Sequence, residues 1–260
     1  MADLSIGLAC MEVKPTLDEQ FQHMASYVKK AKVQGVDILC FPEFALGHGA
    51  EDADYYALSD YQRKITEMAQ GIQIIYGGVR YEGDRCYDTC FVCHDGVSQH
   101  YDKIYLGERE RLCFTAGQEV KLFTHEAKGV PFACLLCYDM HFPELSAKAS
   151  RAGAEIIIAP HRMLSRDAKY RVSIWQKYMG ARAYDNRVYT LAVNGMMGGR
   201  GGGAGVWDMD GNLVACHDDA TEDMLTVSID LDELRGYRDP NNTSMRKRFF
   251  LKDDKEFNQV

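Results

Sequence analysis

The sequence lacks several features that would place it in a special class of protein. No apolar run approaches the roughly eighteen uncharged residues that a membrane-spanning helix needs, so we expect no membrane segment. The first residues, MADLSIGLACMEVK, do not have the basic start and long apolar stretch of a signal peptide. Basic charge is not in excess either, because 30 Lys and Arg face 38 Asp and Glu, for a net charge of −8. These absences predict a cytoplasmic protein with no membrane or nucleic-acid partner.

Internal repeats, linkers and shifts of composition are also missing from the 260 residues. The chain is 46% apolar and 26% charged, which is ordinary for a globular protein. A chain of this length buries roughly three quarters of its unfolded surface, so it needs no disulfide or metal staples. We therefore expect one domain over residues 1–260, in which 236–260 form a C-terminal arm used in oligomer contacts.

The nine cysteines do not suggest a disulfide framework, because most of them lie in apolar, strand-like runs where free cysteine packs as a small hydrophobe. Cys134 and Cys137 have the spacing of a redox pair, but residues three apart in a strand point to opposite faces. The spacing of Cys86, Cys90, Cys93 and His94 superficially resembles that of a metal site. However, Cys90 and Cys93 lie in one apolar run, where their side chains point to opposite faces. A zinc module stays open as a minor alternative.

Apolar runs bounded by turn residues predict buried strands at 4–10, 36–41, 73–79, 89–93, 132–137, 155–159 and 189–193. Helical spacing predicts helices at 16–34, 60–70, 143–152 and 169–187, the first of which starts with a Thr16–Glu19 capping box. Because residues 80–101 leave no room for a helix, hairpins must join some strands. The pattern indicates an α/β protein with mixed sheets.

Polar residues at the ends of these strands are the candidates for chemistry, because ligands collect beyond the carboxyl ends of strands. Glu43 follows Pro42, and a carboxyl among apolar neighbours tends to hold its proton and to suit acid–base work; the alternative is a solvated loop residue. Lys103 follows another strand and could stabilise an oxyanion, or it could be an ordinary surface lysine. Cys137 lies before a helix that opens at Pro143, a place that favours the thiolate; the alternative is a structural core cysteine.

Together these segments resemble the nitrilase superfamily of carbon–nitrogen hydrolases over nearly the whole chain. The resemblance is carried by Phe41-Pro42-Glu43, Lys103, Glu110 to Gly117, Cys137 to Glu144, Gly153-Ala154-Glu155, Ala181-Arg182-Ala183 with Asn186, Asp208 with Gly211, and Arg246 with Arg248. Each motif alone is common, but their order is specific.

The resemblance implies a four-layer α-β-β-α sandwich of two mixed sheets, homodimers or larger assemblies, and no metal or organic cofactor. By position, Cys137 would be the nucleophile, Glu43 the general base and Lys103 the oxyanion stabiliser. Glu110 matches a second glutamate that orients the substrate or supports the lysine. The expected reaction is hydrolysis of a small aliphatic amide or N-carbamoyl amine through a cysteine thioester, with release of ammonia or an amine.

The sequence defines the class of substrate less well than the reaction. Relatives that act on nitriles more often carry Trp-Glu after the cysteine, so Tyr138-Asp139 favours amides. We expect Tyr138, His141, His161 and Arg162 to contact the substrate, with Arg162 binding an anionic end and His161 a polar one. Two alternatives stay open: a true nitrilase, and a catalytically silent binding or scaffold module with the same fold.

Overall fold

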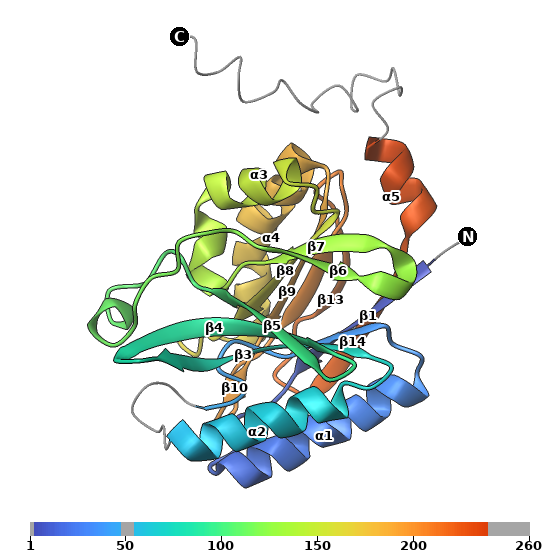
Figure 1. Cartoon of the computed structure of the whole chain (residues 1–260). Helices are drawn as coiled ribbons and strands as arrows, with labels where there is room; N and C mark the ends of the chain where they lie inside the picture. The colour runs from blue at the N-terminus through green and yellow to red at the C-terminus, as the bar shows by residue number, and fades with distance from the viewer. Residues whose placement is uncertain (1–2, 48–54, 239–260) are drawn as a thin grey trace.

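Two six-stranded sheets lie face to face at the centre of the protein (Figure 1). The computed structural model describes residues 3–47 and 55–238. The first sheet has the order β14-β1-β2-β3-β4-β5 and the second β13-β12-β9-β8-β7-β6. In the first sheet β1, β2 and β3 run parallel, and in the second β7, β8 and β9 do, while every other pairing in the two sheets is antiparallel. Both sheets are therefore mixed, as predicted.

The strands of the first sheet are β1 (Asp3–Cys10), β2 (Ile38–Cys40), β3 (Gln73–Glu82), β4 (Arg85–His94), β5 (Val97–Asp102) and β14 (Asp223–Asp230). Those of the second are β6 (Leu122–His125), β7 (Val130–Cys134), β8 (Ile156–His161), β9 (Tyr189–Asn194), β12 (Ala204–Trp207) and β13 (Leu213–His217). A small ribbon consists of β10 (Met196–Met197) and β11 (Arg200–Gly201).

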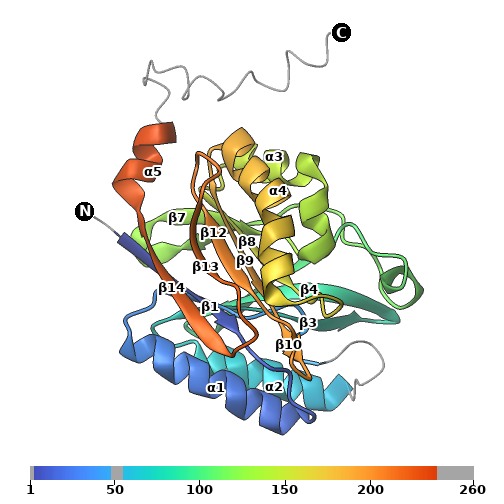
Figure 2. The ribbon, with the colours of Figure 1, turned by 180° about the vertical axis from the view of Figure 1, so that it is seen from behind.

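Helices cover the outer faces of the two sheets, which confirms the four-layer sandwich (Figures 1 and 2). Helices α1 (Leu17–Val33) and α2 (Tyr55–Met68) lie on the first sheet, and α3 (Pro143–Arg151) and α4 (Ala168–Asn186) lie on the second. The remaining helical segments are α5 (Leu231–Arg238) and the short turns η2 (Glu110–Leu112), η3 (Glu126–Lys128) and η4 (Cys137–His141). None of the described helices has the length and apolar character needed to cross a membrane.

Alternation along the strands builds two apolar cores. In β1, Leu4, Ile6 and Leu8 pack between the sheets, while Ala9 packs on the helix side of the first sheet. The period of two that defines a strand therefore gives the first sheet two buried faces. Cys90 and Cys93 belong to different cores, so their predicted divergence is confirmed.

Several boundaries differ from the predictions. Helix α2 begins at Tyr55, five residues before the predicted 60, and ends at Met68. The predicted strand 132–137 ends at Cys134, because Cys137 has a φ of 41° that a strand cannot hold. The argument from strand alternation therefore does not apply to Cys134 and Cys137. Most of the predicted C-terminal arm, including Arg246 and Arg248, falls outside the described residues.

Candidate active site

Glu43 lies in a tight turn just beyond β2. The strand ends as the backbone N–H of Phe41 donates to the Ile75 carbonyl at 2.7 Å, and Pro42 then turns the chain. Gly77 in β3 backs this turn so closely that a Cβ there would lie 2.4 Å from the Glu43 Cα. Only glycine fits at that position. The Glu43 side chain is buried, so the solvated alternative is wrong.

Lys103, directly after β5, is also buried, with 1% of the residue exposed, so the surface-lysine alternative is wrong. Its backbone N–H donates to the Asp88 carbonyl at 2.9 Å, and its own carbonyl accepts from Gly117 at 2.8 Å. The ammonium donates to Glu43 Oε1 at 2.7 Å, to Glu110 Oε1 at 2.7 Å and to Asp88 Oδ2 at 3.1 Å. All three N–H bonds of Lys103 therefore meet carboxyl oxygens.

Two of the predicted residues and one unexpected residue thus surround the lysine. Burial would lower the pKa of Lys103, but the charges of Glu43 and Asp88 outweigh it and hold that pKa well above its ordinary value. Oxygens of Glu43, Asp88 and Glu110 lie within 4.8 Å of one another, which is an arrangement that could hold a metal ion. In this protein the Lys103 ammonium lies between these oxygens, in the place that a metal ion would take.

Glu110 is placed by the short turn η2. Its Oε2 accepts from the backbone N–H of Gly107 at 2.7 Å, which leaves Oε1 directed at Lys103. A quarter of its side chain is exposed, unlike the buried Glu43 and Asp88. Glu110 therefore lies on the solvent-facing side of the cluster formed by the carboxyls of Glu43, Asp88 and Glu110.

Asp88 was missed by the sequence reasoning, although an acid next to an apolar strand run was a usable signal. Burial raises its pKa well above the ordinary value; Lys103 opposes this, and the carboxyls of Glu43 and Glu110 raise it further. A proton on Asp88 can be shared with Glu43, because the two carboxyls are within hydrogen-bonding reach. Burial and the neighbouring carboxyls therefore favour the protonated form of Asp88.

Cys137 begins η4, on the second sheet's side of the site, and is 7% exposed. Burial and then the charge of Glu43 raise the pKa of its thiol well above the ordinary value. The Lys103 ammonium and the backbone N–H of Arg162 act in the opposite direction but do not prevail. The expectation that the helix terminus favours the thiolate is therefore not met: burial favours the neutral thiol, which needs a base. Because both Glu43 and Lys103 act on the thiol, the three predicted residues share one electrostatic environment.

Asp139 fixes the turn that carries Cys137. Its Oδ2 accepts from the backbone N–H of Leu136 at 3.2 Å and from the Tyr101 hydroxyl at 2.7 Å, and its Oδ1 accepts from the backbone N–H of Tyr105 at 2.8 Å. Burial raises the pKa of Asp139 to about 6, although these donors lower it in part. One carboxylate thus ties η4 to the strand that delivers Lys103.

The four predicted substrate-contacting residues lie around η4 and the end of β8. Tyr138 is exposed, and its ring centroid is 5.2 Å from Phe142. The His141 ring packs 4.6 Å from Tyr178, and burial followed by nearby arginines lowers its pKa. His161 is buried. The Arg162 guanidinium stands 5.5 Å from the ring centroid of Phe44, next to Glu43 in the chain.

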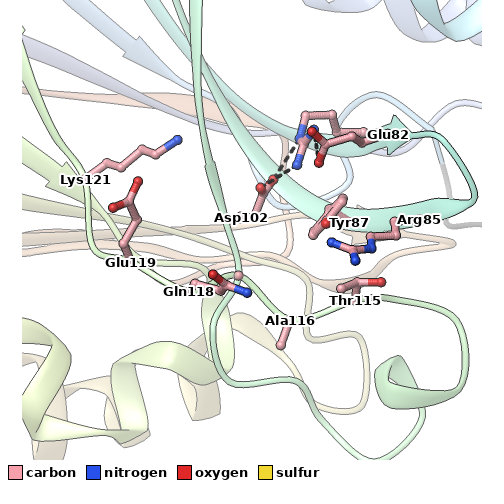
Figure 3. Close-up of a pocket in the computed structure, with 11 residues that line it drawn as sticks. Glu82, Arg85, Tyr87, Asp102, Thr115, Ala116, Gln118, Glu119 and Lys121 are labelled. Atoms are coloured by element: carbon pink, nitrogen blue, oxygen red, sulfur yellow. Dashed lines mark hydrogen bonds and ion pairs between the residues drawn. The ribbon is translucent and has the colours of Figure 1, made fainter.

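A polar pocket of about 380 Å³ lies outside this site, along β3, β4 and the segment after Lys103 (Figure 3). Figure 3 shows Glu119 and Lys121 at one side and Arg85 and Tyr87 at the other. Asp102 at its wall accepts two bonds from Arg80, at 3.1 and 2.7 Å. The pocket therefore contains the ion pair that anchors the residue preceding Lys103.

Comparisons with known proteins agree with this arrangement. The chain is 29% identical over 222 residues to a hydrolase in the agr operon of Staphylococcus lugdunensis, covering 78% of this chain and 91% of that protein. It is 28% identical to the deaminated glutathione amidase of Synechocystis sp., covering 70% of this chain and 74% of that one. The fold matches an amidase from Nesterenkonia sp. with a TM-score of 0.79 at 21% identity, over 89% of this chain and 92% of that chain.

The carbon–nitrogen hydrolase family model matches residues 5–239, which is most of the chain. This match confirms the resemblance drawn from the motifs around Glu43, Lys103 and Cys137. The protein belongs to the carbon–nitrogen hydrolase family of the nitrilase superfamily.

Proposed function

We propose that the protein hydrolyses the carbon–nitrogen bond of a small aliphatic amide or N-carbamoyl amine through a thioester on Cys137. The observation that carries this proposal is the buried Lys103 ammonium, held at 2.7 Å by both Glu43 and Glu110 within the electrostatic reach of the thiol. A cation, a base and a neutral thiol are the parts that acyl transfer to sulfur requires.

In the first half-reaction, Glu43 takes the proton of the Cys137 thiol as the sulfur attacks the amide carbon. The carbonyl oxygen becomes negative. The positive charge of Lys103 stabilises it electrostatically, and the backbone N–H of Tyr138 donates to it, since the first N–H groups of a helical turn have no partner within it. Glu43 then gives the proton to the nitrogen, the carbon–nitrogen bond breaks, and ammonia or an amine leaves.

In the second half-reaction, Glu43 takes a proton from water, whose oxygen attacks the thioester carbon. The carbon–sulfur bond breaks, the acid product leaves, and the proton returns to sulfur as the thiol. One carboxylate thus serves both halves. Amidase structures support this route: in one variant of the Nesterenkonia amidase, the acetamide moiety of fluoroacetamide is covalently added at the active-site cysteine.

The substrate's other end meets Tyr138, His141, His161 and Arg162 in this proposal. His161 and Arg162 follow β8 as Cys137 follows β7, and the two strands are parallel neighbours, so their ends lie at one edge of the second sheet. Arg162 also brings its backbone N–H to the Cys137 sulfur. These residues therefore border the nucleophile.

Ammonia or amine release from a panel of aliphatic amides, N-carbamoyl amines and nitriles tests the proposal. The matched variants are Cys137→Ala and Cys113→Ala, the latter at an exposed cysteine. We expect activity on amides or N-carbamoyl amines, retained in C113A and reduced at least about 10⁴-fold in C137A, because removal of a nucleophile abolishes covalent catalysis. Equal turnover by C137A contradicts the mechanism. A preference for nitriles supports the nitrilase alternative, and an inert wild type supports the silent module.

We also propose that residues 1–260 act as one cytoplasmic domain that associates into homodimers or larger assemblies, as the family resemblance implies. Light scattering coupled to size exclusion tests the association. A monomer at all protein concentrations contradicts it.

A further inference from the structure

Asp102, the last residue of β5, is held by side chains from the two strands beside it. Its carboxylate accepts from Nε of Arg80 in β3 at 3.1 Å and from Nη2 of the same guanidinium at 2.7 Å. The hydroxyl of Thr89 in β4 donates to Asp102 Oδ1 at 2.7 Å. These three residues span three neighbouring strands, and we call them the Arg80–Asp102 clamp; dashed lines meet Asp102 in Figure 3.

The clamp is mostly shielded from water. The exposed fraction of the side chain is 18% for Arg80 and 14% for Asp102, and Thr89 is buried. The guanidinium also lies over the ring of Tyr87, 4.3 Å from the ring centroid. A two-point contact between guanidinium and carboxylate fixes orientation as well as distance, and a partly buried pair is screened less than an exposed one. The clamp is therefore suited to holding the end of β5 in one position.

The opposite face of the same strand ends carries reactive groups. Thr89 pairs with Asp102 in the register of β4 and β5, so the next residues, Asp88 and Lys103, point to the other side of the sheet. There the Lys103 ammonium donates to Asp88 at 3.1 Å and to Glu43 at 2.7 Å. Because Lys103 directly follows Asp102 in the chain, its backbone position is set by the clamped residue.

The segment after Lys103 also returns to the clamp. The backbone N–H of Gly117 donates to the Lys103 carbonyl at 2.8 Å, which closes residues 104–116 into a loop. A Cβ at Gly117 would lie 2.1 Å from the backbone oxygen of Asp102, so this segment packs directly on the clamped residue. Glu110 lies within this loop. A shift of Asp102 would therefore move Lys103 and the base of the loop that carries Glu110.

We propose that Arg80 is a positioning residue for the reaction, which acts through Asp102 to hold the Lys103 ammonium against Glu43 and Glu110. This inference rests on the proposed amide hydrolysis, and it assigns a role to a side chain on the far face of the first sheet from the thiol. A displacement of about 1 Å in a catalytic group can cost about 10²-fold in rate, so a brace at the end of β5 has a kinetic effect.

The first test measures amide hydrolysis by Arg80→Gln and Asp102→Asn. Asparagine keeps the shape of Asp102 but offers Arg80 one acceptor oxygen instead of two. Because Lys103 stabilises charge that develops in the transition state, we expect kcat to fall by about ten- to a hundredfold in both variants, while KM stays within about threefold. The double variant should be no worse than the single ones, because either change opens the clamp. Arg85→Gln, at an exposed arginine of the same pocket, should match the wild type in both tests.

The second test follows the Cys137 thiol and needs no amide turnover. Burial and then Glu43 raise the pKa of Cys137, and the Lys103 ammonium opposes them. A displaced ammonium leaves less thiolate at a given pH, so alkylation of Cys137 by iodoacetamide at pH 8 should be at least about threefold slower in R80Q and in D102N. Peptide mapping follows Cys137 separately from the other eight cysteines.

The two variants separate position from charge. R80Q removes a positive charge and D102N removes a negative one, so a purely electrostatic effect would change the alkylation rate in opposite directions. Opening the clamp slows it in both, and circular dichroism checks the fold of each. If R80Q does not fold, D102N alone decides, because loss of a negative charge by itself would speed alkylation.

The outcomes also separate this inference from the proposed function. If alkylation slows in the clamp variants but the wild type hydrolyses no amide, the proposed function fails and the positioning role stands. The positioning role is overturned if D102N alkylates as fast as the wild type or faster. It is also overturned if the wild type hydrolyses amides and folded clamp variants keep its kcat, or lose only stability to urea.

Discussion

At the scale of single residues, the charge balance around Lys103 depends on Asp88. Three carboxyls face one ammonium in a buried site, and leaving all three ionised would place uncompensated negative charge in a low dielectric. Asp88 and Glu43 are the fully buried pair, and the pKa of Asp88 is raised well above its ordinary value, first by burial. A proton on Asp88 allows Glu43 to stay available as the base.

This reasoning predicts that Asp88→Asn is tolerated and that Asp88→Leu is not. Asparagine keeps a carbonyl oxygen for Lys103 and an N–H for Glu43, as the protonated acid does, so we expect kcat/KM to stay within about threefold. Leucine leaves the ammonium one partner short inside the protein, which should lower kcat/KM by about tenfold or more. Amide hydrolysis assays with folded variants measure both.

Asp84→Asn, in the exposed turn before β4, serves as the matched control for the change of charge. If D88N loses as much activity as D88L while D84N is normal, then Asp88 acts as an ionised carboxylate. The assignment of the proton to Asp88 would in that case be wrong.

At the scale of elements, Asp139 joins η4 to β5 and to the segment that follows it. Because Asp139 is buried, its contribution to the free energy of unfolding depends on pH. Its pKa is about 6 in the folded protein against an ordinary 3.8, first because of burial. The folded state therefore holds this proton more tightly than the unfolded state. The resulting stabilisation is complete below the ordinary pKa, is lost as pH rises through the folded pKa, and is constant above it.

We therefore predict that the free energy of unfolding of the wild type, relative to Asp139→Asn, falls by roughly 3 kcal/mol between about pH 4 and pH 7. Asparagine does not titrate, so the difference isolates Asp139. Urea unfolding of both proteins across this range is the measurement. A difference that is flat, or that grows as pH rises, contradicts the assignment.

The sequence predicted helices α1 to α4 and seven of the twelve strands in the two sheets, but it did not predict strands at β5, β6, β12, β13 and β14. Features that depend on long-range contacts were predicted least well. The Thr16 capping box is present, because it depends only on neighbours in the chain. The end of β7 was misplaced, because the buried apolar residues Leu135 and Leu136 continue a strand-like pattern into the turn that Asp139 fixes. Asp88 could not be assigned a role, because its partner Glu43 approaches only when β2, β3 and β4 pair.

At the scale of the whole molecule, the site forms where the two sheets meet. The first sheet and its loops supply Glu43, Asp88, Lys103 and Glu110, and the second supplies Cys137. The residues Glu43 and Lys103 are 60 positions apart in sequence yet share a hydrogen bond of 2.7 Å. Motif order predicted that these groups would meet, but the buried lysine and the neutral thiol follow from packing that no local pattern records.

The central claim is that the acyl group passes through the sulfur of Cys137 with Glu43 activating both steps. The most direct measurement is intact mass and peptide mapping after mixing the wild type or Glu43→Gln with a p-nitrophenyl ester of an accepted acid. We predict an acyl adduct on Cys137 that forms and clears rapidly in the wild type, and that in E43Q forms at least about tenfold more slowly and then persists, because the carboxylate that accepts the thiol proton and activates water is absent only in the variant. Turnover with no adduct in either protein, or an adduct on another cysteine, would contradict the account.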